Sequence, residues 1–183
     1  QELARARGVE GWLGLRAQMA YMDRASGIGD GKLDREDCKD ALTRWGSSLE
    51  GKYLDVVLNR LDLAGDGLMD YRTFLAALRG ELSPSKAALT QQVFREISGG
   101  NDSVAFEVLA KQLEPQQHPL AFFSDYSPDD VKRHFADVFS FKGGPVTRVP
   151  LKDFVDYVAD IGCALDGEND YFEGTLRALF GLN

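Results

Sequence analysis

The chain has 183 residues, of which 44% are apolar and 27% charged, and this composition suits one or two small globular domains with a packed core. Its net charge of −8 argues against a nucleic-acid-binding protein, and no apolar run approaches the ~18 residues that span a bilayer. The charge is uneven: residues 81–183 hold 9 basic and 16 acidic side chains, whereas residues 1–80 hold 12 and 13.

The first helical pattern in the chain carries an apolar stripe at helical spacing, formed by Trp12, Leu15, Met19 and Met22. Later helices have recognisable starts and stops. Ser83-Pro84 and Ser127-Pro128 each predict an N-cap followed by proline at the first helical position. Gly80 and Gly162 are predicted C-terminal stops.

An internal repeat is the strongest feature of the sequence. Each copy has a helical stretch, a loop rich in small or polar residues, one aliphatic residue and a second helix. The four copies are GDGKLDREDCKDAL (29–42), GDGLMDYRTFLAAL (65–78), GNDSVAFEVLAKQL (100–113) and GPVTRVPLKDFVDYV (144–158). The aligned aliphatic residues are Leu33, Met69, Val104 and Val149, and five positions later come Cys38, Phe74, Leu109 and Phe154.

Helix–loop–helix units that repeat near 35 residues, with an aliphatic residue at the eighth loop position, are typical of EF-hands. We therefore predict an all-α fold of two lobes, each a pair of EF-hands joined by short β pairing between loops. The predicted parts are an N-terminal extension (1–8), hands 1 and 2 (9–80), hands 3 and 4 (83–163) with a long loop (115–127), and a C-terminal helix (166–183).

Four sequence markers in the same order resemble calcyphosine and the calcyphosine-like proteins. They are LARARGVEGWLGL followed by Met22-Asp23, LAALRGELSPSKAAL (75–89), the His118-Pro119 pair and DGENDYFEGTLRALFGL (166–182). The resemblance implies a calcium-binding or calcium-responsive EF-hand protein without enzymatic activity. Because such proteins recur in ciliated and flagellated cells, it also implies a cytoplasmic location and a ciliary or axonemal role.

Loop 2 retains only part of a calcium-ligand set. It spans residues 62–73 and offers the carboxylates Asp62, Asp66 and Asp70. Ala64 stands at the third position, and Thr73 replaces the bidentate glutamate that normally ends such a loop. We expect this loop to bind calcium poorly.

Loop 1 is three residues longer than the standard loop of 12, because it runs from Asp23 to Asp37. Its candidate ligands are Asp23, Ser26, Asp30, Asp34 and Asp37. An aspartate at the last position favours magnesium or weak calcium binding. The alternative is an acidic, solvated turn in which Asp34 and Asp37 favour the start of the next helix.

Loops 3 and 4 are expected to bind no metal. Loop 3 (97–108) has no charged side chain at a ligand position, and loop 4 (142–153) begins with Lys142, which would repel a cation. No nucleotide-binding glycine motif, nucleophile elbow or zinc spacing occurs, so an enzyme is not predicted. His118 and His134 are expected at the surface or half-buried rather than as catalysts.

These features favour a non-enzymatic, largely calcium-independent protein-binding or structural module that needs no cofactor. Its partner would be an amphipathic helix or a cytoskeletal or axonemal assembly. The candidate contact is the last helix, through Phe172, Leu176, Leu179 and Phe180, with ordinary core packing as the alternative. A second hypothesis is a calcium or magnesium sensor that acts through hand 1 and weakly through hand 2.

Overall fold

The computed structural model describes residues 8–25, 29–48, 51–62, 64–123, 126–140, 146–165 and 169–182. The fold is mostly helical with two short antiparallel strand pairs, so the predicted fold class is confirmed. The first half comprises α2 (Gly8–Ala25), β1 (Lys32–Leu33), α3 (Arg35–Trp45), α4 (Lys52–Leu61), β2 (Met69–Asp70) and α5 (Tyr71–Arg79). The second half comprises α6 (Pro84–Ser98), β3 (Ser103–Ala105), α7 (Phe106–Gln112), the 3-10 helix η1 (Pro115–Gln117), α8 (Pro119–Phe123), α9 (Pro128–Phe139), β4 (Arg148–Pro150), α10 (Leu151–Ala164) and α11 (Asn169–Leu179).

The strand pairs join the loops of neighbouring hands in the expected register. Leu33 of β1 lies opposite Met69 of β2. Val104 of β3 lies opposite Val149 of β4. The four aligned aliphatic residues of the repeat therefore meet in two pairs, as EF-hand pairing requires.

Two hydrophobic cores correspond to the two pairs of hands. The residues five positions after each paired aliphatic are all buried, namely Cys38, Phe74, Leu109 and Phe154. The predicted stripe on α2 is buried as well, from Trp12 to Met22. The repeat pattern therefore marks the positions that hold each lobe together.

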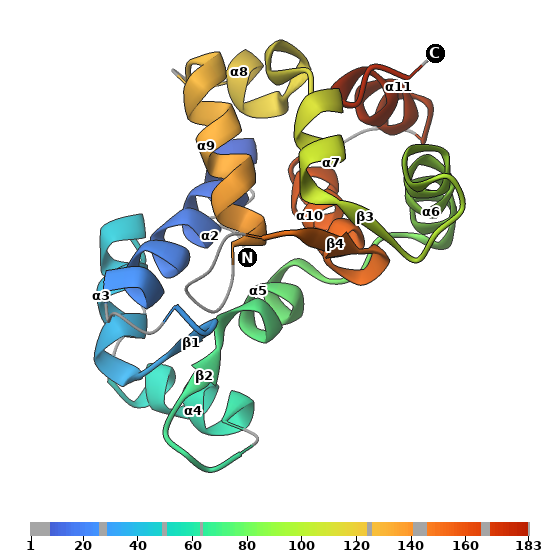
Figure 1. The fold of residues 1–183 in the computed structure, drawn as a ribbon. Coiled ribbons are helices and arrows are strands. Elements are labelled where there is room, and N and C mark those ends of the chain that lie inside the picture. Colours follow the sequence, from blue (N-terminus) through green and yellow to red (C-terminus); the bar gives the residue numbers. More distant parts are fainter. Residues whose placement is uncertain are drawn as a thin grey trace.

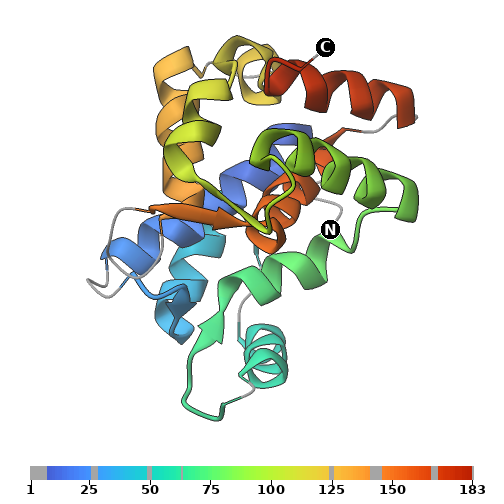
Figure 2. The ribbon, with the colours of Figure 1, turned by 45° about the vertical axis from the view of Figure 1, so that its right-hand side comes forward.

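Helix α2 contributes to both cores. Leu15 and Met19 lie in the core of the first lobe, whereas Leu13 lies in the core of the second. Figure 1 shows α2 and α10 near the centre of the molecule, with α3, α4 and β2 on one side and α6, α7 and α11 on the other. Figure 2 shows the same arrangement after rotation, with α2 again beside α9 and α10. The two lobes therefore share a helix and form one packed unit.

The helix starts follow the sequence signals. Ser83 caps α6 through a hydrogen bond from the Lys86 amide, and Ser127 forms a capping box with Asp130 at the start of α9. Gly80 ends α5 as expected.

The prediction that Gly162 ends a helix is wrong. Helix α10 continues to Ala164, so Gly162 lies inside it. A Cβ atom at this position would lie 2.9 Å from both Leu82 Cδ2 and Phe172 Cε2. The absence of a side chain at Gly162 therefore lets Phe172 of α11, and Leu82 between α5 and α6, pack closely against α10.

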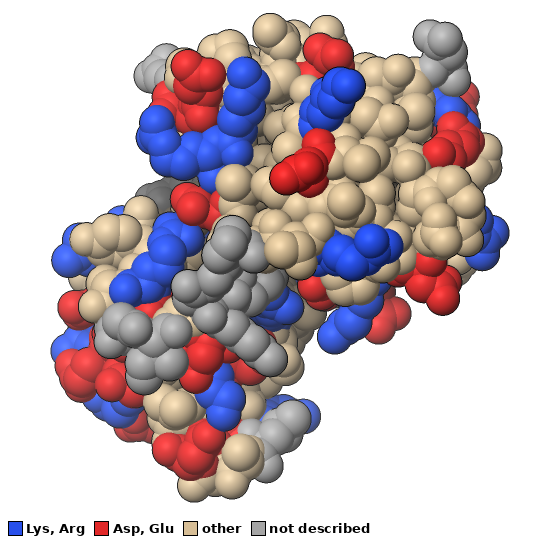
Figure 3. Space-filling view, in the orientation of Figure 1, with Lys and Arg blue, Asp and Glu red and all other residues tan. Residues whose placement is uncertain are grey.

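The segment expected to be a long loop also has more structure than its sequence indicates. Pro115 and Pro119 each begin a short helix, η1 and α8, because proline suits the first helical turn. Among the described residues, no helix has both the length and the apolar character needed to cross a bilayer. Figure 3 shows acidic and basic side chains intermingled over the first lobe, at the bottom of the view. Broad uncharged areas cover the same face of the second lobe, at the top.

Candidate functional site

Loop 1 begins with a buried carboxylate that is tied to the loop glycine. Asp23 is 4% exposed, and its Oδ2 accepts a hydrogen bond from the Gly31 amide at 3.0 Å. In loop 2, Asp62 Oδ2 accepts from the Gly67 amide at 2.9 Å. The two loops therefore place an aspartate and a glycine in equivalent positions, although loop 1 carries three additional residues.

The other candidate ligands of loop 1 contact its backbone. Asp30 accepts a hydrogen bond from the Lys32 amide at 2.9 Å. Asp34 caps α3 by accepting from the Asp37 amide at 2.9 Å. Of the two remaining candidates, Asp37 lies in the first turn of α3, and Ser26 lies outside the described residues. The capping role of Asp34 matches the alternative in which this acidic turn supports the next helix.

Burial and neighbouring charges raise the pKa of two carboxyl groups in loop 1. Burial raises the pKa of Asp23, and the nearby charge of Asp30 adds to this rise. Burial also raises the pKa of Asp37, together with the charges of Asp34 and Asp40. Like charges thus crowd these positions, a condition that a bound cation would relieve.

In loop 2, each candidate carboxylate accepts hydrogen bonds from the loop's own backbone. Asp62 accepts from the Asp66 amide as well as from Gly67, at 3.1 Å. Asp70 caps α5 and accepts from the amides of Arg72 and Thr73, both at 2.9 Å. The loop is therefore closed by carboxylate-to-amide bonds even without a ligand at positions 3 and 12.

A lysine from hand 1 provides a positive charge next to loop 2. Lys32 Nζ lies 2.8 Å from Asp66 Oδ2, and β1 carries Lys32 opposite Asp70 of β2. The hydrogen bond to Asp66 raises the pKa of Lys32, and the same bond lowers the pKa of Asp66. The ammonium group therefore already neutralises one of the three carboxylates that the sequence offers as calcium ligands.

Within the described residues, the candidate ligands do not come together as a metal-binding cluster. In the described part of the chain, no three His, Cys, Asp or Glu side chains come close enough to hold a metal ion. Loop 3 is closed by its own polar groups, because the Ser98 hydroxyl donates to the Asn101 carbonyl and the Asn101 amide donates to the Ser98 carbonyl. Lys142 of loop 4 lies outside the described residues.

The expectation that both histidines lie at or near the surface is wrong. His118 is fully buried, and its Nδ1 accepts a hydrogen bond from the Leu120 amide at 3.0 Å. Its Nε2 therefore carries the proton and donates to the Tyr157 hydroxyl oxygen at 2.7 Å. Burial lowers the pKa of His118 to about 3 and that of His134 to about 4. Both histidines are neutral core residues, and the Leu120 amide and the Tyr157 hydroxyl hold the ring of His118 in place.

Helix α11 places its apolar face inside the second lobe. Its four candidate contact residues are at most 3% exposed, namely Phe172, Leu176, Leu179 and Phe180. Phe180 packs against Phe154 with ring centroids 5.3 Å apart, and α11 lies along α6. The helix therefore fills the lobe's own interior, and a partner would reach these four side chains only if α11 moved.

A buried ion cluster joins the lobes. Asp160 of α10 forms ion pairs with Arg16 of α2 and Arg79 at the end of α5. Arg79 also pairs with Asp156 at 3.0 Å. Burial disfavours the charged form of Arg16, but Asp160 outweighs it and raises the pKa of the guanidinium.

Sequence reasoning missed this cluster, although it contained a signal. Arg16 lies four residues after Trp12 and three before Met19, so it is a charged residue within the apolar stripe of α2. A charge on a buried face requires a buried partner. The sequence did not show that the partner would be Asp160.

The chain is similar to two curated proteins whose names describe calcium binding. It is 21% identical to crustacean calcium-binding protein 23 of Faxonius limosus over 149 residues, which are 81% of this chain and 73% of that protein. It is 33% identical to calcium-binding protein CML37 of Arabidopsis thaliana over 67 residues, which are 37% of this chain and 35% of that protein. No protein-family model matches the chain.

The similarity to calcium-binding proteins and the pairing of the loops both indicate an EF-hand protein. The first match extends over most of the four-hand repeat, and the strand register reproduces the loop pairing that this repeat predicts. The chain is thus a distant homologue of EF-hand calcium-binding proteins.

Proposed function

We propose that this protein is a non-enzymatic, calcyphosine-like EF-hand module that binds a protein partner or supports an assembly, largely without calcium. The observation that carries the proposal is the ion pair between Lys32 and Asp66. It supplies a positive charge beside loop 2 from within the chain. Ala64 and Thr73 also weaken calcium binding by loop 2, because they do not supply the oxygen ligands that calcium needs at these two positions.

The packing of the lobes supports the same proposal. In sensor EF-hands, calcium opens a helix pair and exposes an apolar groove. Here α11 fills the interior of the second lobe, and the cluster around Asp160 ties that lobe to α2 and α5. Opening the second lobe would therefore leave buried charges without partners and would expose apolar surface to water. A constitutive, closed structural unit fits this arrangement, and an axonemal or cytoskeletal assembly is the setting that we propose for it.

A second function, a calcium or magnesium sensor that acts through hand 1, is favoured by one specific observation. Asp23 holds the Gly31 amide as Asp62 holds the Gly67 amide, so the longer loop 1 keeps the same starting geometry. The crowded carboxyl groups of this loop would gain from a cation. Both relatives are named as calcium-binding proteins, which supports a metal-binding function.

Calorimetric titration of metal-stripped protein with calcium, at physiological magnesium, separates the two functions. Trp12 and Trp45 lie on α2 and α3, the helices on either side of loop 1, so their fluorescence should report binding there. The structural module predicts no heat and no fluorescence change up to ~1 mM calcium, the weak end of known hands. Saturable binding that Asp30→Ala abolishes, and that the exposed control Asp102→Ala retains, would establish the sensor instead.

A further inference from the structure

Helix α11 lies outside the four helix–loop–helix units of the fold. Hand 3 consists of α6, β3 and α7, and hand 4 of α9, β4 and α10. The apolar side of α11 nevertheless lies in the core that these two hands form, and the helix packs along α6, as Figure 2 also shows. EF-hand pairs bind amphipathic target helices in apolar grooves. Helix α11 therefore occupies, within the same chain, the position that a target helix would take.

The buried side of α11 shows what shape of helix this groove accepts. Phe180 packs against Phe154 of α10 and Phe135 of α9, with ring centroids 5.3 and 6.4 Å apart. Phe172 Cε2 lies only 2.9 Å from where a Cβ atom at Gly162 would be. The four buried anchors of α11 stand at positions i, i+4, i+7 and i+8, namely Phe172, Leu176, Leu179 and Phe180.

One charged contact adds a requirement at position i+5. Arg177 donates to both carboxylate oxygens of Glu96 on α6, each at 3.2 Å. These bonds are the main cause of the lowered pKa of Glu96. Gln92, also on α6, donates to the same carboxylate at 3.1 Å. The groove itself thus supplies a positioned acidic group, which favours an arginine or lysine at this place in its occupant.

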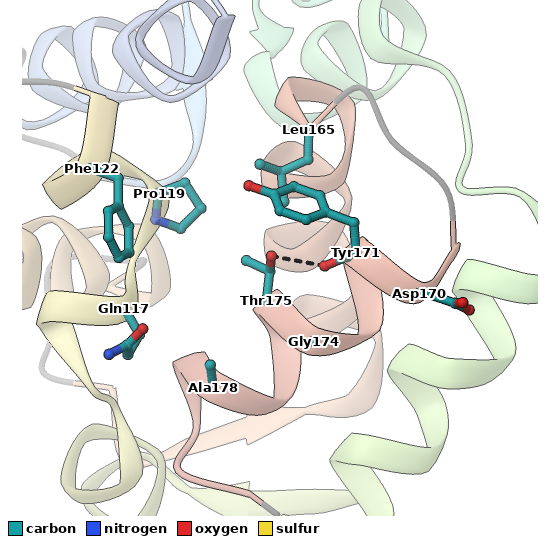
Figure 4. Close-up of a pocket in the computed structure, with 9 residues that line it drawn as sticks. All are labelled: Gln117, Pro119, Phe122, Leu165, Asp170, Tyr171, Gly174, Thr175 and Ala178. Carbon is teal, nitrogen blue, oxygen red and sulfur yellow. Dashed lines mark hydrogen bonds between the residues drawn. The ribbon is translucent and has the colours of Figure 1, made fainter.

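The contact between α11 and the lobe is one-sided, and the helix contains a weak point. Figure 4 shows the outer side of α11, where Tyr171, Thr175 and Ala178 line a space that faces α8. The Thr175 hydroxyl donates to the Tyr171 carbonyl of the same helix at 2.9 Å. A Cβ atom at Gly174 would meet no atom within 4 Å, so packing does not require this glycine. Since glycine inside a helix is less stable than alanine, a helix without it would fit the groove better.

Replacing α11 does not require the lobes to separate. The ion cluster at their junction joins Asp160 of α10 to Arg16 of α2 and Arg79 of α5. The contacts of α11 lie elsewhere, on α6 and in the core of the second lobe. A partner helix that took the place of α11 would cover the same apolar surface and leave this cluster intact.

We propose that α11 is a built-in occupant of a helix-binding groove, and that a partner protein binds by placing its own amphipathic helix there instead. The partner helix carries large apolar residues at i, i+4, i+7 and i+8, and an arginine or lysine at i+5 that pairs with Glu96. This inference rests on the proposed function as a protein-binding module and names its surface and its class of partner. Because the groove lies apart from the metal loops, the exchange does not need calcium.

The test uses a fluorescent synthetic copy of residues 169–182 as the partner helix, in an anisotropy titration with the full chain in EDTA and in calcium. Leu176→Ala weakens α11 within the chain. Leu54→Ala makes the same substitution in the core of the first lobe and is the matched control. A tethered α11 competes at an effective concentration in the millimolar range, so the natural chain should bind the copy only weakly.

The Leu176→Ala chain should bind the copy at least tenfold more tightly than the natural chain, equally in EDTA and calcium. The Leu54→Ala chain should bind it as weakly as the natural chain does. Equal affinity of the two variants would overturn the proposal. A natural chain that sedimented as a dimer and bound no copy would also overturn it, because a second copy of the chain would then be the occupant.

A copy that carries Arg177→Glu tests the contact with Glu96. It should bind the Leu176→Ala chain about tenfold more weakly, and Glu96→Arg in that chain should restore its binding. Glu107→Arg, at an exposed position of α7, is the matched charge reversal and should restore nothing. Equal binding of both copies to the Leu176→Ala chain would remove Glu96 from the site.

Hydrogen exchange on the natural chain tests displacement even if the Leu176→Ala chain does not fold. An excess of isotope-labelled copy should speed exchange of the α11 amides and leave those of α2 and α10 protected. Gly174→Ala in the chain strengthens α11 and should raise the concentration of copy needed by about two- to fivefold. Unchanged exchange in α11 at millimolar copy would overturn the proposal.

The two proposals fail in different ways. Displacement of α11 that required calcium would leave the groove as the docking site, but it would remove the claim that the module works without calcium. A copy that bound in EDTA and left α11 protected would remove the groove as the site. The calcium-independent module would then bind its partner through another surface.

Discussion

Arg16 on α2 and Asp160 on α10 form a buried ion pair across 144 positions of the sequence. Their side chains are 5% and 3% exposed, and Arg79 of α5 approaches the other oxygen of the same carboxylate. One acidic group thus holds two arginines from the first lobe. Ion pairs of Asp153 with Arg72 and of Asp156 with Arg79 add to this contact, so several charged groups of α10 hold the first lobe.

Loss of the Asp160 carboxylate should destabilise the whole chain. Asp160→Ala leaves Arg16 buried without its ion-pair partner and Arg79 with Asp156 alone, so we expect the free energy of unfolding to fall by about 3–5 kcal/mol. Urea denaturation followed by circular dichroism measures the change. Asp55→Ala removes an exposed partner of Arg35 and should change stability little. Equal effects of the two substitutions would show that the buried cluster does not hold the lobes.

Gly162 should tolerate no side chain. Gly162→Ala places a methyl group 2.9 Å from Leu82 and Phe172, so we expect a loss of about 1–3 kcal/mol from overpacking, although alanine is the better helix former. Gly174→Ala, in open space on α11, should instead stabilise by about 0.5–1 kcal/mol. Thermal unfolding of both variants provides the comparison. A stabilised Gly162→Ala protein would contradict the close packing of α10 and α11.

Loop 2 should gain calcium binding when its missing ligands are restored. Ala64→Asp together with Thr73→Glu supplies the third-position oxygen and the bidentate carboxylate, while Asp62, Asp66 and Asp70 are already present. We expect calorimetry to detect a site with a dissociation constant below ~1 mM in this variant and no such site in loop 2 of the natural chain.

Adding Lys32→Ala to this double variant should tighten calcium binding further. The substitution removes the ammonium group that lies on Asp66. Each single ligand substitution, Ala64→Asp or Thr73→Glu alone, serves as a control and should bind weakly. Failure of the combined variants, with the fold intact by circular dichroism, would mean that the loop lacks more than its two absent ligands.

The two buried histidines should make stability depend on pH. The pKa of His118 is about 3 in the folded chain and that of His134 about 4, against an ordinary value of about 6.5. Between these limits the unfolded chain binds more protons than the folded one, so the free energy of unfolding falls as pH decreases from about 6.5. Each histidine adds up to ~1.4 kcal/mol per pH unit to this slope.

Urea titrations at several pH values compare the natural chain with His118→Gln and His134→Gln. Each variant removes one of only two histidines in the chain. The stability difference between the natural chain and either variant should therefore shrink as pH falls through this window. A difference that stayed constant from pH 7 to about 4 would show that the histidine is not buried in its neutral form.

The sequence by itself determined the architecture of the hands. Leu33, Met69, Val104 and Val149 repeat at the same loop position, and this local pattern was sufficient to predict both strand pairs. The helix starts at Ser83 and Ser127 were also predictable, because an N-cap and the following proline act within one turn. The gaps in loop 2 at Ala64 and Thr73 are equally visible in the sequence, since loop ligands are set by spacing along the chain.

Tertiary structure alone decided how the two lobes meet and which polar groups became buried. His118 is polar and sits between prolines, and only its distant partner Tyr157 makes its burial possible. Gly162 resembles a helix stop, and only the close approach of Leu82 and Phe172 explains why a glycine occupies this position within α10. Arg16 and Asp160 are separated by most of the chain, so no local pattern predicts their contact. Local sequence sets local geometry, whereas the burial of a polar group depends on a partner that only the completed fold brings near.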